Sequence, residues 1–171
     1  MKTQLCQVAL VIISTAVTSS PTLAQSPAVA FYCGRTTQNE YATKVQVKGS
    51  ERDQTIVVWK DGLRNMSAKK RCDIVSEKFQ TAWKRSNFRL VPRPEPKTGR
   101  GILCALLTEK QVCQDKDILF SVNNAAQADS IVADLYRAMS PKVSRPIYQS
   151  SSAQSIDMQE LIKSISESAE K

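Results

Sequence analysis

Residues 71–83 read Arg-Cys-Asp-Ile-Val-Ser-Glu-Lys-Phe-Gln-Thr-Ala-Trp. At 100° per residue, the apolar side chains of this stretch fall within one arc of a helix: Cys72, Val75, Phe79, Ala82 and Trp83. The pattern predicts a helix from about Ala68 to Arg85, with Ser67 as its N-cap. We expect its apolar face to pack on a sheet.

Segments rich in β-branched and aromatic residues lie on both sides of this helix. We predict strands at residues 30–33, 43–47, 55–59, 88–91, 100–107 and 117–122. A second helix is predicted over residues 125–139, because Ala128, Ile131, Val132, Leu135 and Met139 share one side. The order βββαβββα predicts an α+β domain over about residues 28–140. We expect one antiparallel sheet of about six strands, with both helices on one face and two disulfides.

Four cysteines lie in this region: Cys33, Cys72, Cys104 and Cys113. None is within two to four residues of another, and the chain has no histidine, so a zinc site is disfavoured relative to two disulfides. Three pairings remain open. A hairpin around residues 108–111 would bring Cys104 close to Cys113 and leave Cys33 for Cys72, which is the pairing that we favour.

The N-terminal residues have the pattern of an export signal: Lys2, an apolar run over residues 5–17, and Thr22-Leu23-Ala24. We predict cleavage after Ala24, with Ala30 as a second candidate position; the alternative is a buried N-terminal helix. No apolar run approaches the length of a membrane-spanning helix. We therefore expect an exported protein of the periplasm, the extracellular space or the thylakoid lumen, either soluble or peripherally attached to a membrane, without a transmembrane segment in the mature chain.

The absence of histidine excludes Ser-His-Asp and Cys-His nucleophile arrangements and the usual histidine metal sites. Two carboxylate pairs remain for a histidine-free enzyme, Asp73 with Glu77 and Asp115 with Asp117. Neither pair belongs to a recognisable motif, and acidic residues at such positions are usually solvated. We assign no catalytic residue, no metal and no cofactor, and we expect a protein that is not an enzyme.

Positive charge is concentrated between residues 60 and 100, which contain 12 Lys and Arg residues and 4 Asp and Glu residues. We predict a basic patch formed by Arg71, Lys78, Arg85, Arg89, Arg93, Lys97 and Arg100. Such a patch favours an anionic lipid surface, an acidic protein or an acidic polysaccharide as partner; the alternative is a solvated face. Nucleic acid would suit the charge but not an exported protein. A secreted inhibitor or effector acting through exposed loops, such as residues 93–100, is the second functional hypothesis.

The residues after 140 are rich in Ser, Pro and Gln and predict a flexible linker. A short helix follows, with Asp157 as its cap and Glu160 three residues later. Its apolar stripe consists of Met158, Leu161, Ile162 and Ile165. This helix either docks on a partner, packs on the domain itself or remains a frayed tail. The sequence does not predict an oligomeric state.

Several segments resemble the circadian oscillating protein family of cyanobacteria, over most of residues 31–139. Residues 71–80 are similar to its Arg-Cys-x-x-Val-Ser-x-x-Phe-Gln pattern. Further similar segments are Phe31-Tyr32-Cys33, Val57-Val58-Trp59, Gly101-Ile102-Leu103-Cys104, Cys113 and Leu119-Phe120-Ser121-Val122. The resemblance implies an exported cyanobacterial protein without an established enzymatic activity, so no catalytic residue is carried over.

Overall fold

The computed structural model describes residues 28–50, 53–60, 66–139 and 155–169. The predicted export signal and the linker over residues 140–154 lie outside this range. The elements, in chain order, are β1 (Val29–Arg35), β2 (Tyr41–Val47), β3 (Gln54–Trp59), α1 (Ala68–Arg85), β4 (Arg89–Pro94), β5 (Gly101–Leu106), the 3-10 turn η1 (Asp115–Asp117), β6 (Ile118–Val122), α2 (Ala125–Met139), β7 (Ile156–Asp157) and α3 (Met158–Ala169).

Both predicted helices are confirmed. The hydroxyl of Ser67 accepts a hydrogen bond from the backbone N–H of Lys70 and caps α1. The backbone N–H of Ser86 donates to the carbonyl of Ala82 at the other end of α1, where the chain turns into extended structure. The last turn of α1 contains Lys84 and Arg85, whose positive charges are favourable beside the free carbonyls of a helix C-terminus.

The strands form two sheets, and the prediction of a single sheet of six strands is wrong. One sheet has the order β1-β2-β3 and the other has the order β6-β5-β4-β7, both antiparallel. No strand pairing joins them among the described residues. They meet through side chains instead: the rings of Trp59 in β3 and Phe120 in β6 lie edge to face, 5.3 Å apart. At this junction aromatic side chains, and not backbone hydrogen bonds, connect the two sheets.

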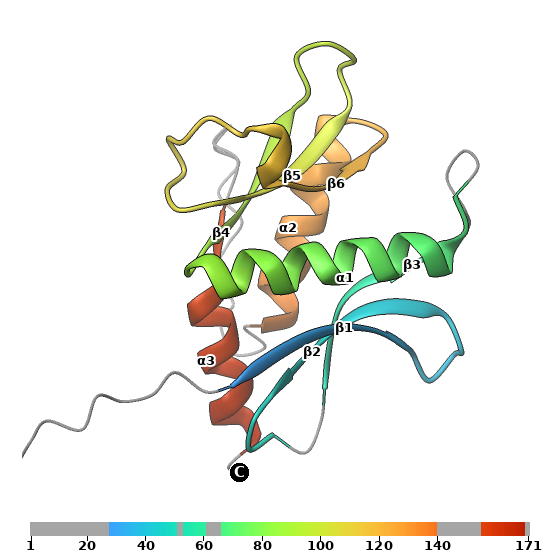
Figure 1. Cartoon of the computed structure of the whole chain (residues 1–171), viewed down its shortest axis with the longest axis vertical. Coiled ribbons are helices and arrows are strands. Elements are labelled where there is room, and N and C mark those ends of the chain that lie inside the picture. Colours follow the sequence, from blue (N-terminus) through green and yellow to red (C-terminus); the bar gives the residue numbers. More distant parts are fainter. Residues whose placement is uncertain (1–27, 51–52, 61–65, 140–154, 170–171) are drawn as a thin grey trace, which may run out of the picture.

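The expectation that both helices cover one face of one sheet is also wrong. α1 packs mainly on β1 and β2, whereas α2 packs mainly on β4 and β5 (Figure 1). One buried core nevertheless includes residues of both sheets and all three helices. Phe79 of α1 joins the two halves, because its ring lies 5.5 Å from that of Phe31 in β1 and 6.2 Å from that of Phe88, just before β4.

The favoured disulfide pairing is confirmed. Cys33–Cys72 links β1 to α1, and Cys104–Cys113 links β5 to the loop that precedes η1. Side chains alternate between the two faces of a strand, so β5 directs Leu103 into the main core and Ile102 and Cys104 to the other face. On that face the disulfide holds the loop over a second, smaller apolar cluster.

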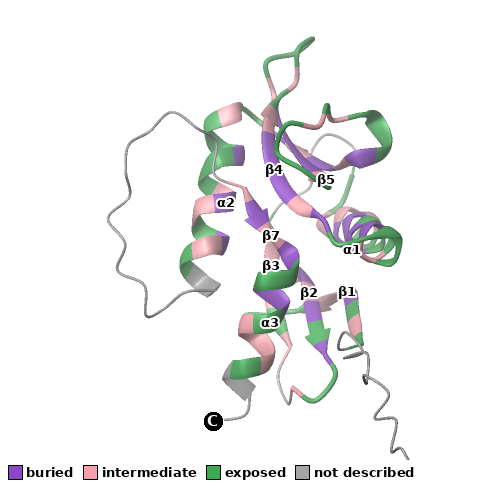
Figure 2. Ribbon diagram, turned by 90° about the vertical axis from the view of Figure 1, so that its left-hand side faces the viewer, coloured by how far each residue is buried: buried purple, intermediate pink, exposed green. Residues whose placement is uncertain are grey.

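The C-terminal helix packs on the domain itself. β7 pairs with β4 through Arg89 opposite Asp157 and Leu90 opposite Ile156. α3 then buries Met158, Leu161 and Ile162 in the main core. Figure 2 shows β7 next to β4, and of its two residues Ile156 is buried and Asp157 is partly buried. The core therefore extends beyond residue 140, and a frayed tail is excluded for the described part of α3.

β4 is longer than the predicted 88–91 strand and continues to Pro94. Proline lacks a backbone N–H and is confined to unpaired edges of a sheet. Beyond Leu90, the second edge of β4 pairs with no described strand, so Pro92 and Pro94 are tolerated there. Among the described helices, none has an apolar stretch long enough to cross a membrane.

Candidate functional site

A groove with a volume of about 420 Å³ lies between α1 and β6. Four of the side chains that line it are cationic: Lys70, Arg71, Lys78 and Arg100. Its apolar lining consists of Met66, Ile74, Val75, Ile118, Leu119 and Phe120. No carboxylate contributes to the lining. We call this feature the α1–β6 groove.

Helix periodicity explains why several of these residues meet. Lys70, Ile74 and Lys78 follow one another at intervals of four, and Arg71 and Val75 lie beside them on the same face of α1. Arg100 arrives from a different part of the chain. It directly precedes β5, whose first residue, Gly101, pairs with Val122 at the end of β6.

Arg71 and Arg100 are half-buried, whereas Lys70 and Lys78 are exposed. The guanidinium carbon of Arg71 lies 4.8 Å from the centroid of the Trp59 ring, within the range of a cation–π contact. Partial burial lowers the pKa of Arg71 below its usual value, although an arginine remains charged at physiological pH. No carboxylate of the described residues forms an ion pair with Arg71. Within the described part of the chain, the positive charge of Arg71 is thus not neutralised, and Arg71 lies where the α1–β6 groove borders the Trp59 ring.

Lys78 has a different environment. Its ammonium group donates a hydrogen bond of 3.0 Å to the carbonyl oxygen of Ile118 and so connects α1 to the start of β6. The ammonium still has two further donors, because a lysine carries three. Lys70 and Arg100 likewise have no ion pair with a described carboxylate. The groove thus combines several cations whose charge is not neutralised by the described part of the chain.

A larger groove, of about 680 Å³, lies between β3, β6 and α2. It shares Arg71, Phe120 and Ser121 with the α1–β6 groove. Its lining also includes Asp134, whose carboxylate pairs with Arg137 at 2.8 Å. The second groove therefore lacks the exclusively cationic character of the first.

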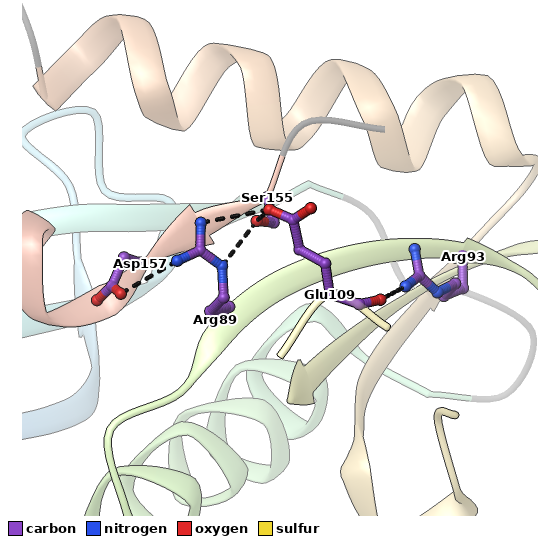
Figure 3. Close-up of polar contacts among 5 residues, drawn as sticks. All are labelled: Arg89, Arg93, Glu109, Ser155 and Asp157. Atoms are coloured by element: carbon purple, nitrogen blue, oxygen red, sulfur yellow. Dashed lines mark hydrogen bonds and ion pairs between the residues drawn. The ribbon is translucent and has the colours of Figure 1, made fainter. Parts of the chain in front are cut away.

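Two residues of the predicted patch are used inside the fold. Arg89 forms ion pairs with Glu109 at 3.4 Å and Asp157 at 3.2 Å, and it donates a hydrogen bond to the hydroxyl of Ser155 at 2.9 Å. Arg93 donates to the backbone carbonyl of Glu109 (Figure 3). These contacts attach the loop after β5 and the β7 segment to β4. The positive charge of Arg89 is compensated by the two carboxylates.

The remaining members of the predicted patch lie apart from the groove. Arg85 is in the last turn of α1, fourteen residues after Arg71 and therefore about 21 Å further along the axis. Lys97 lies in the turn between β4 and β5. The structure thus brings together Arg71, Lys78 and Arg100 but not the other four predicted residues. Sequence reasoning missed Lys70, which lies eight residues, or two steps of four, before Lys78 and could have been placed on the same side of α1 from that spacing.

The carboxylates considered for catalysis do not line either groove. Asp73 is exposed and pairs with Lys69 at 2.7 Å. Asp117 is buried and accepts a hydrogen bond of 3.3 Å from the backbone N–H of Gln114. Glu77 and Asp115 are exposed. Among the residues that the structure describes, no group of three or more His, Cys, Asp or Glu side chains is arranged to hold a metal ion.

Most residues of the 71–80 segment support packing. Ser76 donates a hydrogen bond of 3.0 Å to the hydroxyl of Thr43, which also accepts one of 3.0 Å from the indole N–H of Trp59. The side-chain carbonyl of Gln80 accepts a 2.7 Å hydrogen bond from the backbone N–H of Phe31, at the edge of β1. Cys72 forms the first disulfide. Residues 71–80 thus serve mainly to hold α1 against β1 and β2.

The described residues define a disulfide-bonded α+β domain in which two antiparallel sheets share one core. The family model of the circadian oscillating protein COP23 matches residues 30–163. The chain belongs to this family, which confirms the resemblance seen in the sequence and extends it into α3. Comparison with curated proteins and with solved structures gave no significant match.

Proposed function

We propose that this protein is a non-enzymatic binding protein that attaches to anionic lipid surfaces through the α1–β6 groove. The observation that carries the proposal is the lining of that groove, which has four cations and no carboxylate. Each Lys or Arg close to an anionic membrane contributes about 1 kcal/mol of attraction. Four such charges on one face are therefore sufficient for reversible association.

The apolar part of the groove supports a lipid in preference to an acidic polysaccharide. Met66 lies at the groove and is 37% exposed, and Ile74 is partly buried beside it. Burial of apolar surface adds roughly 25 cal/mol per Å² to the electrostatic attraction. A hydrated polysaccharide offers no comparable apolar surface.

We further propose that the protein acts outside the cytoplasm of a cyanobacterium, in the periplasm, in the thylakoid lumen or at the cell exterior. The export pattern of residues 1–24 supports this proposal, as do the two disulfides, which are typical of oxidising compartments. Fractionation of the native host, with detection of the mature N-terminus by mass spectrometry, tests the compartment.

Co-sedimentation with vesicles tests the lipid proposal. We expect binding to vesicles that contain phosphatidylglycerol, weak binding to purely zwitterionic vesicles, and a steep loss of binding as salt is raised. The double variant Lys70→Glu/Lys78→Glu should abolish binding. The matched control, Arg85→Glu/Lys97→Glu, changes the net charge equally but away from the groove and should retain most of it. Equal loss in both variants, or binding insensitive to salt, would refute a role for the groove.

The loop between β5 and η1 favours a second candidate function, that of a secreted inhibitor or effector. Leu107 and Val112 are 59% and 79% exposed, and the Cys104–Cys113 disulfide closes this loop. A constrained loop with exposed apolar side chains loses little entropy on binding a partner protein. Photocrosslinking from position 112 in periplasmic extract tests this candidate: a single crosslinked protein that is lost in Leu107→Ser would support it.

A further inference from the structure

We propose that the α1–β6 groove binds one molecule of a single-chain amphiphile with an anionic head group, such as a long-chain carboxylate, with Arg71 contacting the head group. This inference rests on the proposed function, because it assigns a ligand class to the same groove. The proposed function concerns attachment to a membrane surface, whereas this inference concerns a single amphiphile molecule bound from solution, without a membrane.

The composition of the groove matches the two parts of such a molecule. Ligand pockets are commonly about 300–1,000 Å³ in volume, mostly apolar, with a few polar groups that fix the orientation. The α1–β6 groove has a volume of about 420 Å³ and an apolar floor that includes Ile74, Val75 and Leu119. The cations are the only charged groups in its lining. This distribution favours a ligand that is both apolar and negatively charged.

Arg71 is better suited to hold the head group than the other cations. The planar guanidinium presents paired donors that match a carboxylate or phosphate in a bidentate geometry. The Trp59 ring stacks against the guanidinium and limits its motion, which reduces the entropy lost on binding. Among the described residues no carboxylate occupies its donors. Lys70, which also lines the groove, adds a second positive charge.

The contact between Arg71 and Trp59 also supplies a reporter. The chain has two tryptophans, Trp59 and Trp83. Trp83 lines neither groove and packs near Phe31, with the ring centroids 6.1 Å apart. In the variant Trp83→Phe, the intrinsic fluorescence therefore reports on Trp59 alone. A ligand that engages Arg71 should change this fluorescence.

The test is a titration of Trp83→Phe with dodecanoate below its micelle concentration. We expect saturable binding of one molecule per chain, with dodecanol and acetate each binding at least tenfold more weakly, because each has only one of the two required parts. Arg71→Gln should weaken dodecanoate binding at least tenfold, and Arg71→Lys should weaken it less. Arg85→Gln, which removes a charge from the same helix away from the groove, should leave it unchanged.

The variants should be compared only when circular dichroism and non-reducing peptide mapping show the native fold and both disulfides. If Arg71→Gln fails this check, Arg71→Lys replaces it, because lysine keeps the charge but lacks the paired donors and should still weaken dodecanoate binding. Dodecanoate binding no tighter than acetate or dodecanol, or binding unaffected by the Arg variants, would overturn the inference. Vesicle binding that persists in that case would leave the proposed function standing, whereas dodecanoate binding without vesicle binding would reject the proposed function alone.

Discussion

The guanidinium of Arg71 lies 4.8 Å from the centre of the Trp59 ring, so the first turn of α1 contacts the end of β3. The indole of Trp59 also donates a hydrogen bond to Thr43 in β2 and contacts Phe120 in β6 with its ring. One side chain thus connects α1 with both sheets. Trp59 therefore both contacts Arg71, one of the four cations of the α1–β6 groove, and joins the two halves of the core.

The buried polar network below Trp59 gives the first prediction. Thr43 accepts hydrogen bonds from both Trp59 and Ser76. Thr43→Val leaves two buried donors without a partner, at about 1–3 kcal/mol each, so we expect a loss of about 2–6 kcal/mol in the free energy of unfolding. Ser76→Ala removes one donor and keeps the Trp59 bond, and it should cost about 1 kcal/mol. Urea unfolding measures both; equal losses would contradict the proposed sharing.

The two disulfides should contribute unequally to stability, because they close loops of different length. The sequence separations are 39 for Cys33–Cys72 and 9 for Cys104–Cys113. Loop entropy predicts stabilisation of about 3.9 and about 2.7 kcal/mol respectively. Denaturant unfolding of the two double-alanine variants measures the difference. A larger loss on removal of Cys104–Cys113 would show that covering the second apolar cluster matters more than loop entropy.

Gly101 is required where β5 starts beside α2. A Cβ atom at this position would lie 2.2 Å from the backbone carbonyl oxygen of Asn124, which cannot move without displacing the start of α2. Gly101→Ala should therefore destabilise the fold by roughly 1–3 kcal/mol through overpacking. Gly34→Ala is the matched control, since its Cβ meets the flexible side chain of Lys44 at 2.8 Å. Thermal unfolding should show the smaller effect for Gly34→Ala.

Tyr32 should titrate unusually late. Burial, a hydrogen bond to Asp53 and the negative charge of Asp53 raise the pKa of Tyr32 to about 12. Because the folded state holds the Tyr32 proton more tightly than the unfolded state, the protonated phenol stabilises the fold. This stabilisation is complete below the unfolded pKa of about 10 and is lost as the pH rises towards about 12. The phenolate absorbance, taken as the difference between the wild type and Tyr32→Phe, measures the titration. In Asp53→Asn the pKa of Tyr32 should fall; an unchanged pKa would exclude the role of Asp53.

α3 should be part of the cooperative unit. Leu161 is 1% exposed in the main core, and Leu→Ala at such positions costs about 2–5 kcal/mol. We expect Leu161→Ala to lower the free energy of unfolding by this amount without a separate transition. Lys163→Ala, on the exposed side of the same helix, should have little effect. Two unfolding transitions in the wild type would contradict the shared core.

Much of the local structure could be predicted from the sequence. The helix over residues 68–85 and its Ser67 cap follow from periodicity and capping chemistry, which depend only on neighbouring residues. β7 could not be predicted in this way, because it is a two-residue strand with no alternating pattern. Its pairing with β4 depends on contacts more than sixty residues apart in the sequence, such as that between Arg89 and Asp157.

For the candidate site, too, some features could be predicted from the sequence and others depend on the fold. Arg71 and Lys78 share a helix face, so their proximity follows from the sequence. Arg89 has the same charge and lies in the same basic segment as the groove residues. Only the fold shows that Glu109 and Asp157 neutralise Arg89, while Arg100 is brought to the groove by the pairing of β5 with β6.

The sequence by itself determined the α+β class, the bounds of α1 and α2, and the preferred pairing of the cysteines. These properties arise from local periodicity, from capping and from the short separation of Cys104 and Cys113. Tertiary structure decided that the strands divide into two sheets, that α3 completes the core and that three predicted basic residues meet at one groove. These outcomes depend on which distant side chains pack together, and no local pattern in the chain specifies that.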